Sequence, residues 1–454
     1  MHFHNRKKEL EHLKNILESE EFQFYVIWGR RRIGKSALLL KAIENQSLPV
    51  VYFQANELDE LNNLHQFKQE VNNILNDPTF SMLQDNWEVY FKYLAQKKII
   101  IVIDEFPYLI KSNAGIKSLF QRIIDLSWKK TTNKLIFCGS SIQMMESEVL
   151  GAKSPLYGRR TGQNKIEPLQ YYHLQAFFPS MHREEIIQAY GTLGGIPYYL
   201  NTFSDKKSYW ENLETLLTPQ SLLFFEVEFY LRYEFDQIKT YNSILNAIAG
   251  GETEQSKIKN LVTDIKGNLS SYLKKLSIVG LIEKRVPFGE LELKSRSRNS
   301  RYYLKDNYFR FWYQYILPNK TLIQSGQSNL VRNKIQSDFS NYMGYIYEEV
   351  VYEWLLSKNG QEPFLFDQIG RWWYQDVEID WIFQKGTTIT FVEVKWSVLN
   401  KKKIQTIYNK LKSKTTKFSQ KREREQFIIV GKAIKSLPEP LPNDLFVFDL
   451  TNII

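Results

Sequence analysis

One short segment constrains the fold of this chain more than any other. Residues 29–36, Gly-Arg-Arg-Arg-Ile-Gly-Lys-Ser, fit the pattern G-x-x-x-x-G-K-[ST] in full. An apolar, strand-like run, FQFYVIWG, leads into this segment, and a helix-like run, ALLLKAIEN, follows it. A strand, a glycine-rich loop and a helix in this order form the structural context that such a motif requires. The chain is therefore predicted to contain an α/β domain built around a phosphate-binding loop.

The rest of the first 169 residues alternates strand-like and helix-like segments. LPVVYFQAN, KKIIIVIDEF and NKLIFCGSS read as strands, and the second is apolar along its length, as expected for a strand covered on both faces. This alternation is typical of a parallel sheet with helices on both faces. The sole cysteine, Cys138, lies in one of these strands, which excludes an internal disulfide and cysteine-rich zinc motifs.

The loop has the residue types needed to hold a nucleoside triphosphate, and ATP is the expected cofactor. Its backbone N–H groups wrap the phosphates, and the helix N-terminus adds a favourable dipole. Gly29 and Gly34 permit close backbone approach. Lys35 is expected to contact the β and γ phosphates, and Ser36 to contact Mg²⁺. The candidate nucleotide-binding residues are Gly29, Arg30, Arg31, Arg32, Ile33, Gly34, Lys35 and Ser36.

Two adjacent carboxylates end the apolar strand IIIVIDEF. Asp104 is expected to hold Mg²⁺ through a water molecule. Glu105 is expected to orient and deprotonate the attacking water. A phosphate-binding loop followed by these two acids predicts ATP hydrolysis rather than passive nucleotide binding.

With GRRRIGKS and VIDEF the chain resembles the AAA+-related ATPases that have an additional catalytic glutamate. The resemblance implies a polar sensor at the end of the next strand, where Ser140 and Ser141 stand, and Ser141 is the catalytic candidate. A serine here also suits the N-cap of the following helix, and both roles are compatible.

The same resemblance implies an arginine finger within YGRRTG, acting in cis or from a neighbouring copy in an oligomer. Arg159 and Arg160 are both candidates, and the alternative is a solvated basic turn. Near the N-terminus, Asn5-Arg6 followed by Glu9-Leu10 resembles the segment that lies near adenine in this class.

The middle of the chain is predicted to hold two smaller domains. Residues 170–236 read as a helical lid. Residues 237–305 read as three helices and a hairpin, the order of a winged helix-turn-helix that contacts DNA or serves as a structural lid. Its predicted positive charge comes from Lys257, Lys259, Lys266, Lys274, Lys275, Lys284, Arg285, Arg296, Arg298 and Arg301.

Residues 306–454 follow an α-β-β-α-β pattern and contain a second group of acidic residues. Asp380 lies in one predicted strand, and Glu393 and Lys395 share one face of the next. A hairpin would bring the three together. Two carboxylates and a lysine on one sheet face are able to bind a divalent cation and activate water for phosphodiester cleavage.

This arrangement resembles the PD-(D/E)XK nuclease superfamily, although Ile379 stands where the motif has a proline. The resemblance adds Glu348, on the preceding helix, to Asp380 and Glu393 as a metal ligand, with Lys395 as a catalytic residue. On a helical wheel Glu349 is expected on the far side of that helix. The alternative is an inactive nuclease fold or a solvated strand pair.

Over essentially its full length the chain resembles archaeal-type prokaryotic ATPases with a winged helix and a C-terminal, nuclease-related domain of unknown function. The motifs GRRRIGKS, VIDEF, GSS, YGRRTG, GGIPYYL and EID…EVKWS carry this resemblance. The resemblance indicates the fold more than the pathway. The first hypothesis is an ATP-dependent, DNA-directed nuclease, with an ATP-controlled switch that binds DNA or a protein, or a remodelling ATPase, as alternatives. The net charge of +10 is compatible with DNA as a partner. The chain has no apolar run of about 20 residues and no signal-like N-terminus, so a cytoplasmic location is expected.

Overall fold

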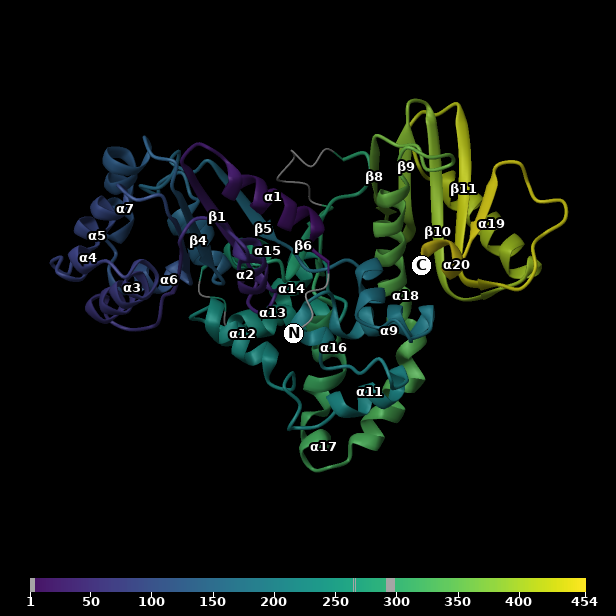
Figure 1. The fold of residues 1–454 in the computed structure, drawn as a ribbon. Coiled ribbons are helices and arrows are strands. Elements are labelled where there is room, and N and C mark those ends of the chain that lie inside the picture. Colours follow the sequence, from purple (N-terminus) through teal and green to yellow (C-terminus); the bar gives the residue numbers. More distant parts are fainter. Residues whose placement is uncertain (1–4, 264, 266, 291–298) are drawn as a thin grey trace. The chain divides into compact units, whose positions relative to one another are not determined.

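The computed structural model describes residues 5–454 except 264, 266 and 291–298. The chain divides into two compact units (Figure 1). The first comprises Met1–Pro168 with Ile196–Tyr198, and the second comprises Leu169–Gly195 with Tyr199–Ile454. Among the helices of the described residues, none combines the length and the apolarity needed to cross a membrane. The predicted boundaries at residues 169, 236 and 305 remain predictions.

The first unit contains a five-stranded, fully parallel sheet with the order β2-β3-β4-β1-β5. The predicted α/β class with a parallel sheet is confirmed. Since the strands are parallel, the loop after β1, the acids at the end of β3 and the serines after β4 lie at the same edge of the sheet. The strands are β1 (Gln23–Gly29), β2 (Val50–Gln54), β3 (Ile100–Asp104), β4 (Lys134–Gly139) and β5 (Gly162–Ile166).

The helices of this unit pack on the sheet largely through aromatic side chains. Phe67 stacks on Phe91, and Phe120 meets both Phe91 and Phe137 edge-on. These four rings are fully buried. The helices are α1 (Lys7–Glu18), α2 (Lys35–Ile43), α3 (Glu60–Leu75), α4 (Pro78–Ser81), α5 (Trp87–Leu94), α6 (Phe106–Ser112), α7 (Ile116–Ile123) and α8 (Ile142–Met144).

The second unit begins with helices and a short antiparallel sheet of two strands, β6 (Ile282–Arg285) and β7 (Arg301–Leu304). The three helices before β6 and this strand pair occur where the sequence predicts them. Lys266, Arg296 and Arg298 lie outside the described residues. The helices are α9 (Arg183–Leu193), α11 (Tyr209–Leu216), α12 (Glu226–Glu234), α13 (Ile238–Ala249), α14 (Gln255–Leu261) and α15 (Leu269–Ile278). The short helix α10 (Pro197–Leu200) spans the point at Tyr198 where the division between the two units falls.

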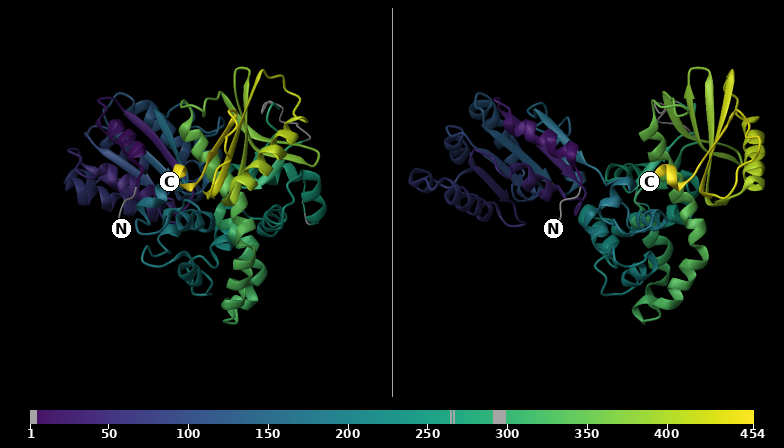
Figure 2. Two further views of the ribbon diagram at one scale, coloured as in Figure 1. Left: turned by 90° about the vertical axis from the view of Figure 1, so that its right-hand side faces the viewer. Right: turned by 45° about the vertical axis from the view of Figure 1, so that its right-hand side comes forward.

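The C-terminal part of this unit is a mixed five-stranded sheet with the order β12-β11-β10-β9-β8. Helix α18 covers one face and α19 the other (Figures 1 and 2). The strands are β8 (Gln368–Tyr374), β9 (Val377–Lys385), β10 (Thr388–Leu399), β11 (Arg424–Ile434) and β12 (Leu445–Phe448). The helices are α16 (Asn307–Phe311), α17 (Lys320–Gln324), α18 (Ser328–Lys358), α19 (Lys401–Thr415) and α20 (Leu450–Ile453).

The predicted α-β-β-α-β pattern is wrong by one strand before α19. The segment WWYQDVEIDWIF, interpreted as a single strand, is a hairpin in which Tyr374 pairs with Val377. Gln375 adopts a left-handed backbone with φ 53°, so the chain reverses over Gln375 and Asp376. The resulting β8 strand carries Arg371, a residue that the single-strand interpretation left without a role.

Candidate functional site

Both glycines of the loop occupy backbone positions that favour glycine. At Gly29, φ is 154° and an added Cβ would lie only 2.5 Å from the carbonyl oxygen of Ile166. At Gly34, φ is 95° and the residue is the N-cap of α2. A side chain at Gly29 would collide with β5, and one at Gly34 would strain the turn into the helix. These two residues therefore set the path of the loop.

The lysine of the loop is fixed by contacts within the first unit. Lys35 is buried, and its Nζ donates hydrogen bonds to the carbonyl oxygens of Gly29 at 2.9 Å and Arg30 at 3.1 Å. Arg6 is also buried and donates to the carbonyl oxygen of Ile33 at 3.4 Å. The N-terminal segment predicted to lie near adenine is thus bonded to the phosphate-binding loop.

Ser36 and Asp104 meet at the sheet edge, as expected for a shared magnesium site. The Ser36 hydroxyl donates to Oδ2 of Asp104 at 2.7 Å, and the Asp104 side chain is buried. A hydroxyl and a carboxylate side by side are oxygen donors of the kind that Mg²⁺ prefers. These residues fit the predicted cation.

Tyr52 is a third member of this group that sequence reasoning missed. Its hydroxyl donates to the same Asp104 oxygen at 2.5 Å. The sequence signal is only a tyrosine near the end of a predicted strand. The contact requires β2 to lie beside β3, with Gln54 in register with Asp104. The order of strands in a sheet cannot be predicted from the residues of one strand.

Glu105 is held in place by its backbone and by Ser140. It has a left-handed φ of 56°, and its N–H donates to Oδ1 of Asp104 at 2.9 Å. Its carboxylate accepts the N–H of Ser140 at 3.0 Å and also the Ser140 hydroxyl. A strained, non-glycine backbone of this kind is common at functional sites.

Of the two serines after β4, Ser140 is the one that contacts Glu105. Ser141 is the N-cap of α8, and its hydroxyl accepts the N–H of Met144 at 3.5 Å. The capping role considered for this position is therefore present. The structure places the catalytic candidate Ser141 one residue away from the serine that binds the glutamate.

The two arginine-finger candidates have different surroundings. Arg159 forms an ion pair with Asp125, with Nη2 3.1 Å from Oδ2. The guanidinium of Arg160 lies 5.7 Å from the centre of the Tyr157 ring, and its Nη1 is buried without a hydrogen-bond partner. Burial lowers the pKa of Arg160 from its ordinary value. Arg159 is held by Asp125, which also pairs with Lys129, whereas Nη1 of Arg160 has no such partner, so Arg160 is the stronger candidate.

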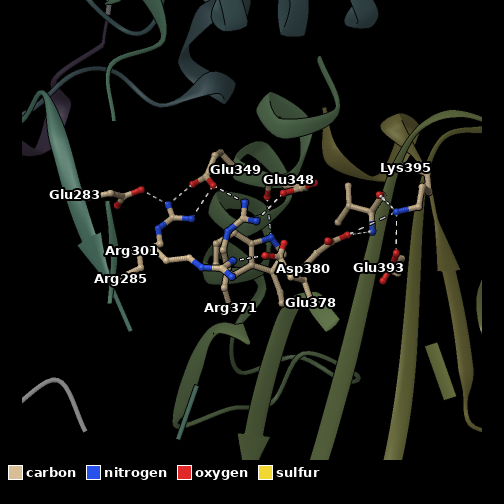
Figure 3. Close-up of polar contacts among 12 residues, drawn as sticks. Glu283, Arg285, Arg301, Glu348, Glu349, Arg371, Glu378, Asp380, Glu393 and Lys395 are labelled. Atoms are coloured by element: carbon tan, nitrogen blue, oxygen red, sulfur yellow. Dashed lines mark hydrogen bonds and ion pairs between the residues drawn. The ribbon is translucent and has the colours of Figure 1, made fainter. Parts of the chain in front are cut away.

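In the second unit, β9 and β10 bring the predicted acidic residues together (Figure 3). The N–H of Val394 donates to Asp380 at 2.8 Å. The Lys395 ammonium lies 2.8 Å from Glu393 and 4.0 Å from Asp380. Burial raises the pKa of Asp380 to about 8, and the charges of Glu348 and Glu393 add to this shift.

Each neighbouring glutamate is bound by an internal cation, as Figure 3 shows for Glu348 and Glu349. Lys414 from α19 binds Glu393 at 2.7 Å. Arg371 from β8 binds Glu348 and Glu349, each at 2.7 Å. The carboxylates are thus shared among basic side chains of several elements.

The prediction that Glu349 lies on the far side of its helix is wrong. Glu349 contacts Arg371 of β8, and Arg285 of β6 binds it at 2.6 Å. Burial raises the pKa of Glu349, but these two guanidiniums outweigh it and hold that pKa at about 2. The helical-wheel prediction assumed that α18 packs against the C-terminal sheet alone. The β6–β7 strand pair covers a second side of this helix, and Glu349 lies on that side.

The residues of this cluster do not fit the predicted second divalent cation as they are arranged. In the described part of the chain, no group of three or more His, Cys, Asp or Glu side chains is placed to hold a metal ion. Glu348 is bound by Arg371, and Glu393 by two lysines. The cluster is neutralised from within.

Comparison with known proteins agrees with this picture of the first unit. A family model described as "ATPase domain predominantly from Archaea" matches residues 3–203. A second model, described as "Archaea bacterial proteins of unknown function", matches residues 312–407. The solved structure of the Walker-type ATPase PABY2304 of Pyrococcus abyssi, 21% identical, covers 69% of this chain and 96% of its own, with a TM-score of 0.51. That likeness shows a shared fold.

Two proteins of Methanocaldococcus jannaschii are related in sequence. The uncharacterized ATP-binding protein MJ0423 is 39% identical over 46 residues, which are 10% of this chain and 78% of that protein. The uncharacterized protein MJECL04 is 41% identical over 453 residues, which are 99% of each chain. The predicted ATPase domain is confirmed, and the chain belongs to the family of archaeal ATPase-domain proteins that includes MJECL04.

Proposed function

We propose that the first unit hydrolyses ATP in a Mg²⁺-dependent reaction at the carboxyl edge of its parallel sheet. The observation that carries this proposal is the contact of Ser36 with Asp104 beside a Glu105 carboxylate held by Ser140. When bound by Ser36 and Asp104, Mg²⁺ neutralises charge on the β and γ phosphates. The protein side chains supply positioning and proton transfer.

Each residue has a defined task in this reaction. The N–H groups of residues 29–36 bind the phosphates, and the Lys35 ammonium fixes the transferring group. Glu105 orients water and accepts its proton. Arg160 is the candidate that stabilises charge on the γ phosphate, in cis or from a second copy, because Arg159 is held in an ion pair with Asp125.

Replacement of the loop lysine tests this proposal. Lys35→Ala should reduce ATP turnover to background, since the positive charge that Lys35 places on the β and γ phosphates is lost. Lys41→Ala is the matched control, because Lys41 lies on the same helix, is exposed and forms an ion pair with the exposed Glu44. Steady-state phosphate release measures both. Wild-type turnover by Lys35→Ala would refute the assignment.

For the second unit we propose a DNA-directed module under ATP control, with a nuclease-like C-terminal fold that does not cut in this arrangement. The internal cations on Glu348 and Glu393 favour this switch over a metal-dependent nuclease. DNA as the partner is supported by the net charge of +10.

The two alternatives for the second unit are separated by a cleavage assay. Wild type and Glu393→Ala are incubated with supercoiled DNA and Mg²⁺ or Mn²⁺, with and without ATP. We expect no cutting by either protein. Cutting by wild type that Glu393→Ala lacks would reverse the choice and establish the nuclease.

A further inference from the structure

The segment around α19 carries a concentrated positive charge. Residues 394–422 contain nine lysines and one arginine and no Asp or Glu. Most of these residues belong to α19 and to the turn that follows it. The simplest interpretation of so many lysines is a helix face exposed to solvent. A binding role therefore needs further support from the residues around the helix.

Helix α19 has one apolar and one basic side. Ile404, Tyr408 and Leu411 are buried in the core of the C-terminal sheet. Lys402 and Lys410 are exposed on the opposite side, about 12 Å apart along the helix. Lys417, just beyond the helix, is exposed as well, and no carboxylate of the described residues pairs with any of these three lysines.

The basic side of α19 adjoins the acidic cluster of β9 and β10. Lys414 of α19 binds Glu393, and Lys395 on the same strand is 40% exposed. By contrast, both arginines of the β6–β7 strand pair are held in ion pairs. Arg285 is paired with Glu349, and Arg301 with Glu378. These two arginines are therefore poor candidates for contacting DNA, whereas Lys402, Lys410 and Lys417 have no carboxylate partner among the described residues.

The chemistry of the exposed side favours a nucleic acid over a membrane or a protein. Its exposed positions within α19 are Lys, Gln, Thr, Asn and Ser, so no apolar face is left to enter a bilayer. The same positions lack the aromatic anchors that dominate protein interfaces. Evenly exposed lysines without carboxylate partners suit the repeated phosphates of a duplex.

We propose that Lys402, Lys410 and Lys417 form a phosphate-binding surface for duplex DNA. The surface leads the backbone of the duplex toward Lys395 and the acidic cluster. This inference rests on the DNA-directed function proposed above and names the surface that binds the duplex, in place of the predicted winged helix.

The test uses the full-length protein and a fluorescent DNA duplex, with anisotropy measured over a range of NaCl concentrations. The variant Lys402→Gln/Lys410→Gln/Lys417→Gln should bind at least tenfold more weakly. Its plot of log affinity against log salt should be shallower by about 2 to 3, because each lost phosphate contact removes about 0.9 from the slope.

Two triple variants with the same change in net charge serve as controls. Lys98→Gln/Lys130→Gln/Lys153→Gln removes exposed lysines of the first unit. Lys259→Gln/Lys274→Gln/Lys275→Gln removes exposed lysines of the predicted winged helix. Both should bind DNA like wild type. A loss confined to the second control, or shared equally by all three variants, would overturn the α19 surface while DNA binding itself stands.

Failure of the underlying DNA-directed function gives a different result. Wild type would then show no salt-dependent binding to the duplex at any concentration. Binding of the protein to vesicles that contain phosphatidylserine is measured as well. Binding to vesicles without binding to DNA would overturn the proposal in favour of an anionic membrane.

Discussion

Ser140 and Ser141 are neighbours at the end of β4 with different contacts. Ser140 donates two hydrogen bonds to the Glu105 carboxylate, whereas Ser141 caps α8. The motif GSS predicts that a polar group stands at this edge of the sheet. It cannot tell which serine turns toward the glutamate, because that depends on where β4 ends and α8 begins.

The two serines should therefore differ when each is replaced. Ser140→Ala should lower kcat about tenfold or more with little change in KM, since Glu105 loses its positioning hydroxyl. Ser140→Thr, which keeps the hydroxyl, should restore much of the rate. Ser141→Ala should keep kcat and cost about 1 kcal/mol of stability through the lost cap. The reverse pattern would make Ser141 the functional serine.

Glu353 is a buried carboxylate of α18 outside the acidic cluster. Burial raises its pKa to about 7, although the Tyr190 hydroxyl at 2.8 Å and the Tyr171 N–H at 3.2 Å oppose the shift. Between pH 4.5 and 7 the folded state therefore keeps a proton that the unfolded state loses. This contribution to stability is present below about pH 4.5 and is lost as the pH rises to 7.

Denaturant unfolding of the second unit at several pH values measures this effect. Glu353→Gln should flatten the decline of the unfolding free energy between pH 4.5 and 7. Glu20→Gln, a change at an exposed residue, should leave the decline in place. An unchanged pH profile in Glu353→Gln would contradict the assigned pKa.

At the scale of elements, α18, β8 and the β6–β7 strand pair are joined by a partly buried chain of charges. Arg371 lies between Glu348 and Glu349, and Arg285 extends the chain to β6. The sequence shows the glutamates but not their partners. A hairpin hidden in one apolar run and a second covering element decide which charges meet.

Loss of the central guanidinium should be costly. Arg371→Gln leaves Glu348 without its cation and Glu349 with Arg285 alone, so about 3 kcal/mol of stability should be lost. Lys385→Gln, which breaks a pair with Asp367 that is more than half exposed on both sides, should cost less than about 1 kcal/mol. Urea unfolding compares the two. Equal losses would show that the chain of charges adds nothing to stability.

At the scale of the whole molecule, the features that the sequence predicts correctly are those determined by contiguous segments of the chain. The parallel sheet follows from repeated strand and helix patterns, and the loop from eight consecutive residues. The contact of Tyr52 with Asp104 requires strand order, and that of Glu349 with Arg285 joins residues far apart in the chain. Periodicity along the sequence carries no information about such pairings.

Glu105 gives the most direct test of the central claim, that the first unit is built to hydrolyse ATP rather than only to bind it. The measurement compares ATP binding and single-turnover hydrolysis in wild type and Glu105→Gln. The variant should bind ATP with wild-type affinity and lose about 100-fold or more of the hydrolysis rate, because it keeps the shape of Glu105 without the base. Hydrolysis by Glu105→Gln at the wild-type rate would contradict the account.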